Sequence, residues 1–397
     1  MMRKDIVIVG AGPAGSSCAY FLARLGHNVL LVDKRRFPRE KVCGDAISPR
    51  SLKTLEEMKL LSTIERSGFK KSDGITIFSP SGYCVSAKSP KTDFLPYGYV
   101  APRVKLDELL WNHAVDAGAE FLEVSVKEPL LKDKSVVGVK GKHDGNTIEI
   151  NSETVVAANG AFSALARHLL GEKWKQRGGG IGVALRAYFS GVESFDFVEF
   201  HYERAVLPGY GWIFPVGDAM ANVGVGVMFE RGKMSLNACF KRFVSDAAKL
   251  KGAKQVSKAK GWLVPTGGGS RHRRAMAGIL FVGDAASFVN PLTGEGISYA
   301  LESGKLAADV IAKALRLEDT SMRTLEKYDD AWKERFAADF RYSLLLRRLI
   351  KRPLLLDRII KNASEDEKLA ELLCGVVTNV LPKRKAMTPI ALLKFLL

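Results

Sequence analysis

The sequence has 397 residues, of which 47% are hydrophobic and 26% are charged, and its formal net charge is +17. A chain of this length and apolar content is expected to form more than one lobe or one large α/β unit, and it is not disordered or low in complexity. Five cysteines without CxxC spacing favour a reducing, cytoplasmic compartment, and we expect neither a disulfide framework nor a metal site. The positive charge leaves nucleic acid, an anionic membrane surface or an acidic protein as partners.

The chain opens with a βαβ pattern. A β-branched strand at 5–9 precedes a glycine-rich turn at 10–15, a predicted helix at 17–25 and a second strand at 28–32 that ends in Asp33. In this setting the turn lets backbone N–H groups approach a pyrophosphate, and the acidic residue suits ribose hydroxyls. The pattern predicts a dinucleotide site, with a glycine-rich turn that binds nothing as the alternative.

The remaining elements follow in chain order. We expect helices at 49–66 and 104–117, short strands over 120–156, an antiparallel sheet over 181–229, a buried strand at 278–282, a helix at 296–314 and a basic helical tail from 323. The charge-free run at 6–23 is too rich in glycine and serine for a membrane span or a signal peptide.

A second motif decides which dinucleotide is expected. The strand at 278–282 is followed by Gly283 and Asp284, and Pro291 to Ile297 opens the next helix. A carboxylate at this place suits a ribityl hydroxyl, and the first amides of a helix suit the electron-rich edge of a reduced flavin. Since only one glycine-rich dinucleotide motif is present, we expect no separate nicotinamide domain.

Together with this Gly-Asp pair, the elements Arg103-x-x-Leu-Asp-x-x-Leu110 and 155–163 resemble the para-hydroxybenzoate hydroxylase-like flavoproteins, with Asn159 where these normally have Asp. The resemblance implies FAD. The residues that it and the glycine turn assign to cofactor binding are Gly10, Gly12, Pro13, Ala14, Gly15, Asp33, Lys34, Arg39, Cys43, Gly44, Arg103, Asn159, Gly160, Gly283, Asp284, Pro291, Gly294, Gly296 and Ile297.

Two further motifs are similar to the geranylgeranyl reductase family within this superfamily. They are the pair Cys43-Gly44 and the run Tyr210-x-Trp212-x-Phe214-Pro215. The resemblance implies reduction of C=C bonds in a polyprenyl group of a membrane lipid, quinone or diphosphate precursor. It implies Cys43 and Gly44 as catalytic residues and Tyr210, Trp212, Phe214 and Pro215 as the substrate site. NAD(P)H or a reduced, acidic carrier protein is the expected electron donor.

Other interpretations stay open at this point. The aromatic run could be ordinary core, and Cys43 could be a small buried residue in a tight turn. A flavin monooxygenase or halogenase acting on an aromatic or polyketide substrate shares the FAD framework. A lipid-binding or electron-transfer flavoprotein without turnover is the non-enzymatic alternative.

The tail explains part of the charge. Residues 341–361 contain seven cations and one anion in an amphipathic pattern, which is typical of helices on anionic lipid, although a docked helix pair with a solvated basic face fits equally. Arg271, Arg273 and Arg274 form another basic cluster, expected to bind a headgroup phosphate, NADPH or an acidic donor protein. No nucleic-acid motif is apparent, so we expect no nucleic-acid partner. The predicted location is cytoplasmic, with peripheral contact at the inner face of the membrane.

The predicted fold class is α/β: a Rossmann-like FAD-binding domain with an inserted antiparallel-sheet substrate domain and a C-terminal helical tail. The FAD-binding domain is expected at 1–65, 96–172 and 275–320. The substrate domain is expected at 66–95 and 173–274, and the basic helical region at 321–397.

Overall fold

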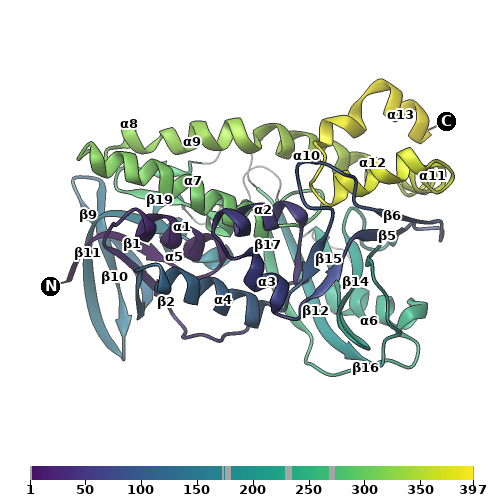
Figure 1. Ribbon diagram of the computed structural model, residues 1–397, viewed down its shortest axis with the longest axis horizontal. Coiled ribbons are helices and arrows are strands. Elements are labelled where there is room, and N and C mark those ends of the chain that lie inside the picture. Colours follow the sequence, from purple (N-terminus) through teal and green to yellow (C-terminus); the bar gives the residue numbers. More distant parts are fainter. Residues whose placement is uncertain (1, 172–173, 175–179, 229–234, 268–272, 397) are drawn as a thin grey trace.

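A computed structural model of the protein describes residues 2–171, 174, 180–228, 235–267 and 273–396. It has a mixed α/β fold with several sheets (Figure 1). One large sheet lies at the end of the molecule that holds the N-terminus, a second large sheet lies at the opposite end, and the C-terminal helices extend over both (Figure 1).

The first sheet has a parallel core in the order β19, β11, β1, β2, β8. Its central strand is buried from Ile6 to Val9, which is why the β-branched run carries no polar alternation. The parallel strands are β1 (Met2–Val9), β2 (Val29–Asp33), β8 (Glu120–Glu123), β11 (Asn146–Ala157) and β19 (Ile279–Phe281). The antiparallel strands are β9 (Ser125–Lys132), β10 (Ser135–His143) and β18 (Ala275–Met276).

The helices on this sheet begin earlier, or break sooner, than the sequence pattern predicts. Helix α1 (Pro13–Arg24) starts inside the glycine turn, because proline is well placed in the first helical turn. The predicted helix at 49–66 is two helices, α2 (Pro49–Glu57) and α3 (Leu61–Arg66), separated where Lys59 has a φ of 59°. The others are α4 (Arg103–Asp116), α5 (Ala164–Leu170), α7 (Ile297–Arg316) and the 3₁₀ turns η1 (Gly160–Phe162) and η4 (Gly283–Ala286).

The second sheet runs in the order β16, β12, β15, β14, β13, β5, β6, with β17 also paired to β12. One of its faces packs on α6 (Leu236–Asp246), which is followed by η3 (Ala248–Leu250). Its strands are β5 (Gly74–Phe78), β6 (Cys84–Lys88), β12 (Ile181–Ser190), β13 (Val198–His201), β14 (Tyr210–Gly217), β15 (Met220–Met228), β16 (Lys254–Gln255) and β17 (Lys260–Pro265). A small third sheet joins β3 (Ala46–Ile47), β7 (Gly98–Val100) and β4 (Lys70–Ser72).

The tail is helical and forms part of a hydrophobic core. Helices α11 and α12 pack against β6, and their apolar side chains share a core with Ile75, Ile77 and Val85 (Figure 1). The tail elements are α8 (Met322–Leu325), α9 (Lys327–Trp332), the π-helical η5 (Lys333–Ala337), α10 (Ala338–Ile350), α11 (Pro353–Glu365), α12 (Glu367–Val377), η6 (Lys383–Met387) and α13 (Pro389–Leu396). Among the helices described, none is long and apolar enough to cross a bilayer.

Candidate functional site

One large cavity, of about 1060 Å³, lies between the two large sheets and the tail. The residues that follow strands β1, β2, β11 and β19 line it, so it opens at the carboxyl edge of the parallel strands. That edge is where open α/β sheets bind their ligands. The volume is at the upper end of the range for small-molecule sites.

The glycine turn forms the first part of this cavity, and at Gly10 it leaves no room for a side chain. Gly10 has a φ of 105°, and a Cβ atom there would lie 2.5 Å from the carbonyl oxygen of Ala158. Asp33 accepts a hydrogen bond from the amide of Ala11 at 2.9 Å, which ties the end of β2 to the turn. Arg39 forms an ion pair with Asp107 at 3.0 Å. The turn is therefore held close to the ends of β2 and β11, because the amide of Gly10 also donates to the carbonyl oxygen of Val32 and Gly10 packs on Ala158.

Most of the residues predicted from the sequence meet in this cavity. Those lining it are Gly10, Gly12, Pro13, Ala14, Asp33, Lys34, Arg39, Cys43, Gly44, Arg103, Asn159, Gly160, Tyr210, Trp212, Phe214, Asp284, Pro291, Gly294, Gly296 and Ile297.

Three predicted site residues, Gly15, Gly283 and Pro215, lie outside the cavity lining and pack against neighbouring elements. A Cβ atom on Gly15 would lie 1.8 Å from the carbonyl oxygen of Gly10, and one on Gly283 would lie 3.0 Å from Cβ of Ala14. These two glycines allow close approach between the turn and its neighbours. Pro215 alternates with Phe214 along β14 and so points to the opposite face, where Ile213 packs beside α6.

The lining suits the FAD expected from the sequence. The side-chain oxygen Oδ1 of Asn159 is buried and has no hydrogen-bond partner among the described residues. An orphaned acceptor of this kind implies a missing donor, which a cofactor hydroxyl or amide would supply. Asp284, in η4 after β19, lines the cavity, and the loop 290–297 before α7 lies beside it: a Cβ atom on Gly296 would be 3.5 Å from Oδ1 of Asp284.

The aromatic side chains of β14 line a different part of the cavity. Tyr210, Trp212 and Phe214 occupy one face of the strand, with adjacent ring centroids 6.2 Å apart. The hydroxyl of Tyr210 donates to the carbonyl oxygen of Thr293, and this hydrogen bond joins the second sheet to the loop 290–297. A Cβ atom on Gly44 would lie 3.1 Å from the ring of Phe214. Glycine at position 44 therefore lets the rings of Phe214 and Trp212 pack close to the Cys43-Gly44 turn.

A buried polar cluster that contacts the backbone of Cys43 was not predicted from the sequence. Asn222 donates to the carbonyl oxygen of Cys43 and to the carboxylate of Asp45, both at 2.8 Å, and accepts from the Trp212 indole at 3.0 Å. The Tyr188 hydroxyl donates to Asp45 at 2.5 Å. Burial raises the pKa of the Asp45 carboxyl, although these hydrogen bonds act against the shift. The cluster fixes the backbone of the Cys43-Gly44 turn.

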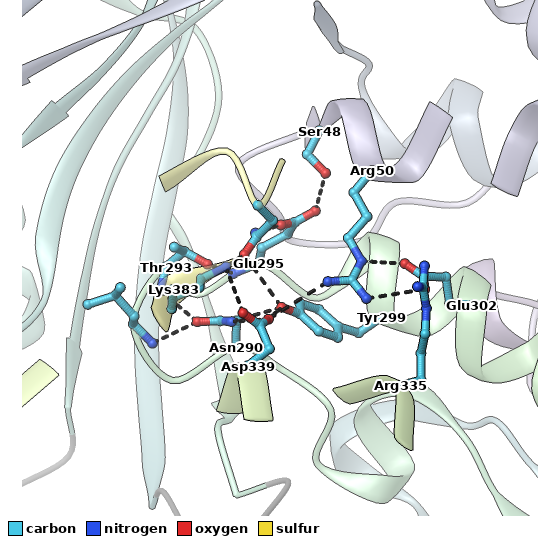
Figure 2. A network of polar contacts seen from close by, with 12 residues as sticks. Ser48, Arg50, Asn290, Thr293, Glu295, Tyr299, Glu302, Arg335, Asp339 and Lys383 are labelled. Carbon is cyan, nitrogen blue, oxygen red and sulfur yellow. Dashed lines mark hydrogen bonds and ion pairs between the residues drawn. The ribbon is translucent and has the colours of Figure 1, made fainter. Parts of the chain in front are cut away.

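A second buried network supports the loop 290–297 from the side of the tail (Figure 2). Glu295 accepts hydrogen bonds from Ser48 and from Asn379, and burial raises its pKa. Lys383, whose side chain is 1% exposed, donates to Asn379 and lies 3.3 Å from Asp339. Burial lowers the pKa of Lys383.

The same network extends toward the surface. Arg50 forms a buried ion pair with Glu302, and Arg335 also binds Glu302, at 2.7 Å (Figure 2). The members of the network come from four segments that are far apart in the sequence, at 48–50, 295–302, 335–339 and 379–383, so no local motif predicts it.

The structure buries one arginine of the basic cluster predicted at Arg271, Arg273 and Arg274. The guanidinium of Arg274 is buried, pairs with Asp329 at 2.9 Å and lies 3.6 Å from the Trp332 ring centroid. Arg273 is exposed, and Arg271 lies outside the described residues. Arg274 therefore links the start of β18 to α9. No group of His, Cys, Asp or Glu residues in the described chain is arranged to hold a metal ion.

Comparison with known families identifies the cofactor. Residues 3–339 match the family model described as an FAD binding domain. The chain belongs to the FAD-dependent oxidoreductases, in the family of the geranylgeranyl reductases. The family resemblance expected from the sequence, the mixed α/β FAD-binding fold and FAD as cofactor are thereby confirmed.

Three relatives place the chain within this FAD-dependent family. It is 32% identical to a menaquinone reductase of Mycolicibacterium smegmatis, over 88% of this chain and 85% of the relative. It is also 32% identical to a digeranylgeranylglycerophospholipid reductase of Methanocaldococcus jannaschii, over 98% and 97%. The crystal structure of a geranylgeranyl bacteriochlorophyll reductase-like protein from Thermoplasma acidophilum superimposes with a TM-score of 0.84 at 26% identity, covering 98% and 99%.

Proposed function

We propose that this protein is an FAD-dependent reductase that saturates C=C bonds of a polyprenyl group on a membrane lipid, a quinone or a diphosphate precursor. The single observation that carries the proposal is the continuity of the cavity from the glycine turn to the aromatic face of β14. The names of its relatives support it, because a prenyl chain is common to menaquinone and to digeranylgeranylglycerophospholipid.

The chain's own residues have to position and protect the reacting alkene. Bound FAD, once reduced, supplies the hydride. An isolated alkene has no electron sink, so orientation and electrostatics must lower much of the barrier. The rings of Tyr210, Trp212 and Phe214 give the prenyl chain an apolar surface and exclude water.

Cys43 and Gly44 are the proposed catalytic pair. Cys43 lines the cavity, and its carbonyl oxygen is held by Asn222. We assign to its thiol either delivery of the proton to the second alkene carbon or positioning of the flavin ring. Gly44 lets the rings of Phe214 and Trp212 pack beside this turn.

The anaerobic reaction tests this function. Protein loaded with FAD and reduced with dithionite should be reoxidised by a polyprenyl quinone, phospholipid or diphosphate, and the product should gain two hydrogens per saturated bond. Cys43→Ala should slow alkene reduction more than flavin reduction. The control Cys84→Ala, on the exposed part of β6, should leave both rates unchanged. FAD-loaded protein that no prenyl substrate reoxidises would contradict the proposal.

We also infer that the tail contacts an anionic membrane surface. Six cations in 341–361 are exposed, namely Arg341, Arg348, Lys351, Arg352, Arg358 and Lys361. Large apolar side chains are exposed beside them, with Leu354 77% and Ile390 72% exposed. Cations around exposed apolar residues are typical of interfacial helices.

Vesicle binding checks this surface without removing the tail, which belongs to the core. Replacing Arg348, Lys351 and Arg352 by Gln should weaken binding to vesicles with anionic lipid while FAD is retained. The matched control replaces Lys132, Lys134 and Lys142 by Gln. These lysines are exposed on β9, β10 and the turn between these two strands. Equal binding by the two triple variants would refute a membrane role for the tail.

The domain division at 1–65, 96–172 and 275–320 against 66–95 and 173–274 remains our proposal for how the chain separates cofactor and substrate binding. It is supported by the placement of β5 and β6 in the second sheet. NAD(P)H or a reduced carrier protein is the proposed electron donor.

A further inference from the structure

A smaller recess, of about 360 Å³, adjoins the large cavity, and cations dominate its wall. Lys41, Arg103, Arg186, Lys258 and Lys260 line it, with Glu40 as the one acidic side chain among the described lining residues. Lys41, Arg103, Arg186, Lys260 and Glu40 line both spaces, so the two are neighbours. Within the described chain, the glycine turn at 10–15 lines the large cavity and not the recess.

Arg186 is buried in this wall with part of its hydrogen-bonding capacity unused. Its side chain is 2% exposed, and its guanidinium lies 4.4 Å from the ring centroid of Tyr188. Nη2 contacts the Glu40 carboxylate at 3.3 Å, whereas Nε and Nη1 have no partner among the described residues. Buried charged donors without acceptors are costly, so the arrangement favours binding of an anion.

The charges around Arg186 are also unbalanced. Arg186 and Lys260 stand directly opposite each other on β12 and β17, where like charges repel. Glu40 is the carboxylate that binds both of them. Arg103 is already paired with Asp107. A second negative group in the recess would relieve the repulsion between the two strands.

Lys41 adds a cation at the boundary with the large cavity. Its Nζ donates to the carbonyl oxygen of Val42 at 3.2 Å and lies 4.3 Å from the Trp262 ring centroid. Burial, followed by repulsion from Arg103, lowers the pKa of Lys41 to about 8, although Asp284, Cys43 and Asp107 act in the opposite direction. A bound anion would favour its protonated form.

We propose that this recess binds the phosphoryl group of a small molecule whose remainder extends toward the flavin cavity. Guanidinium groups bind phosphate oxygens through paired N–H donors, and lysines add point charges. The phosphoryl group belongs either to a nicotinamide dinucleotide that reduces the flavin or to the headgroup of the prenyl substrate. The burial of Arg186 favours a small anion over the surface carboxylates of a carrier protein.

Binding of inorganic pyrophosphate to the FAD-loaded protein tests the site by calorimetry. Arg186→Gln and the double variant Lys258→Gln, Lys260→Gln should each weaken binding by roughly tenfold to a hundredfold, as expected for loss of hydrogen bonds to a charged group. The matched control Lys254→Gln changes an exposed lysine on β16, next to β12 but outside the recess, and should bind as the unmodified protein does.

Kinetics then distinguish the two sources of the phosphoryl group. If Arg186→Gln raises KM for NADPH and lowers the NADPH rate relative to the dithionite rate, the donor carries the group. If it raises KM for a prenyl diphosphate instead, the substrate carries it.

Pyrophosphate that fails to bind, or binds equally to all the variants, overturns the proposal. So does a defect confined to reduction by an acidic carrier protein. The identity of the larger molecule rests on the proposed reductase function, but the anion site does not. Pyrophosphate binding with the expected variant pattern, in a protein that reduces no prenyl substrate, would refute the function and keep the site.

Discussion

Two regions that shape the large cavity differ in what they are made of. The glycine turn is made of backbone, and Gly10 and Gly15 leave no space for an added atom. The support behind the loop 290–297 is made of buried charged side chains, in which Glu295, Asp339 and Lys383 meet (Figure 2). Substitutions that add atoms should therefore damage the glycine turn most. Substitutions that remove a charge should damage the support of the loop 290–297 most.

The largest effect is expected in the glycine turn. Gly10→Ala should abolish FAD binding or folding, because the new Cβ atom would lie 2.5 Å from the Ala158 carbonyl oxygen. Gly26→Ala is the control: Gly26 also has a positive φ, of 83°, but has no atom within 4 Å of an added Cβ. It should cost about 1 kcal/mol and retain FAD, as for any alanine in this conformation. Flavin absorbance of the purified variants measures the difference, and FAD retention by Gly10→Ala would show that close packing is not what shapes the turn.

The next effect is expected in the charged network. Lys383→Met should lower the free energy of unfolding by about 3 kcal/mol, since it leaves Asp339, among the described residues, with only the longer ion pair to Arg50, at 3.8 Å. Lys385→Met, at an exposed position of the same short helix, should change it by less than about 0.5 kcal/mol. Urea unfolding compares them, and equal stabilities would mean that the network does not depend on this charge.

The pH dependence of stability tests the outer part of the network. Burial raises the pKa of Glu302, but Arg50 and then Arg335 outweigh it and hold the pKa below its ordinary value. A carboxyl with a lowered pKa stabilises the fold above its unfolded pKa of about 4.3, and this stabilisation is lost as the pH falls toward the folded pKa. Glu302→Gln should remove that decline, which for one group is at most about 1.4 kcal/mol per pH unit.

Urea unfolding at a series of pH values below about 5 measures this slope. Glu365→Gln, at an exposed position on α11, is the control and should keep the slope of the unmodified protein. An unchanged slope in Glu302→Gln would show that the ion pair with Arg50 contributes no pH-dependent stability.

The smallest effect is expected for the hydrogen bond that joins Tyr210 of the second sheet to the loop 290–297. Tyr210→Phe removes the donor to the Thr293 carbonyl oxygen and should cost about 1 kcal/mol, the usual net value of one hydrogen bond. FAD should dissociate faster because the loop is less restrained. A flavin release rate equal to that of the unmodified protein would assign the hydroxyl to packing alone.

The contrast between the glycine turn and the charged network also explains which parts of the site could be predicted from the sequence. The glycine turn, Gly283-Asp284 and the Tyr210-x-Trp212-x-Phe214 run are short contiguous motifs, so they can be found in the sequence and compared with those of a known family. The charged network around Glu295 and the cationic recess around Arg186 are each built from residues that are far apart in the sequence. Arg186 meets Glu40 and Lys260 only because β12 pairs with β17 beside the 40–45 segment.

Local patterns also failed where a single backbone angle or a tertiary partner decided the outcome. The helix predicted at 49–66 breaks at Lys59, although its apolar periodicity continues into α3. Arg274 is one of a basic cluster in the sequence, but in the structure it is buried against Asp329 and Trp332, more than fifty positions later in the chain.

Mass spectrometry of lipid extracts from cells that express the protein tests the central claim most directly. Cells with the unmodified protein should accumulate a prenyl lipid or quinone that has gained two hydrogens per saturated bond, relative to cells expressing Gly10→Ala. An identical set of prenyl lipids in both, with FAD-loaded protein present in the first, would contradict a prenyl reductase.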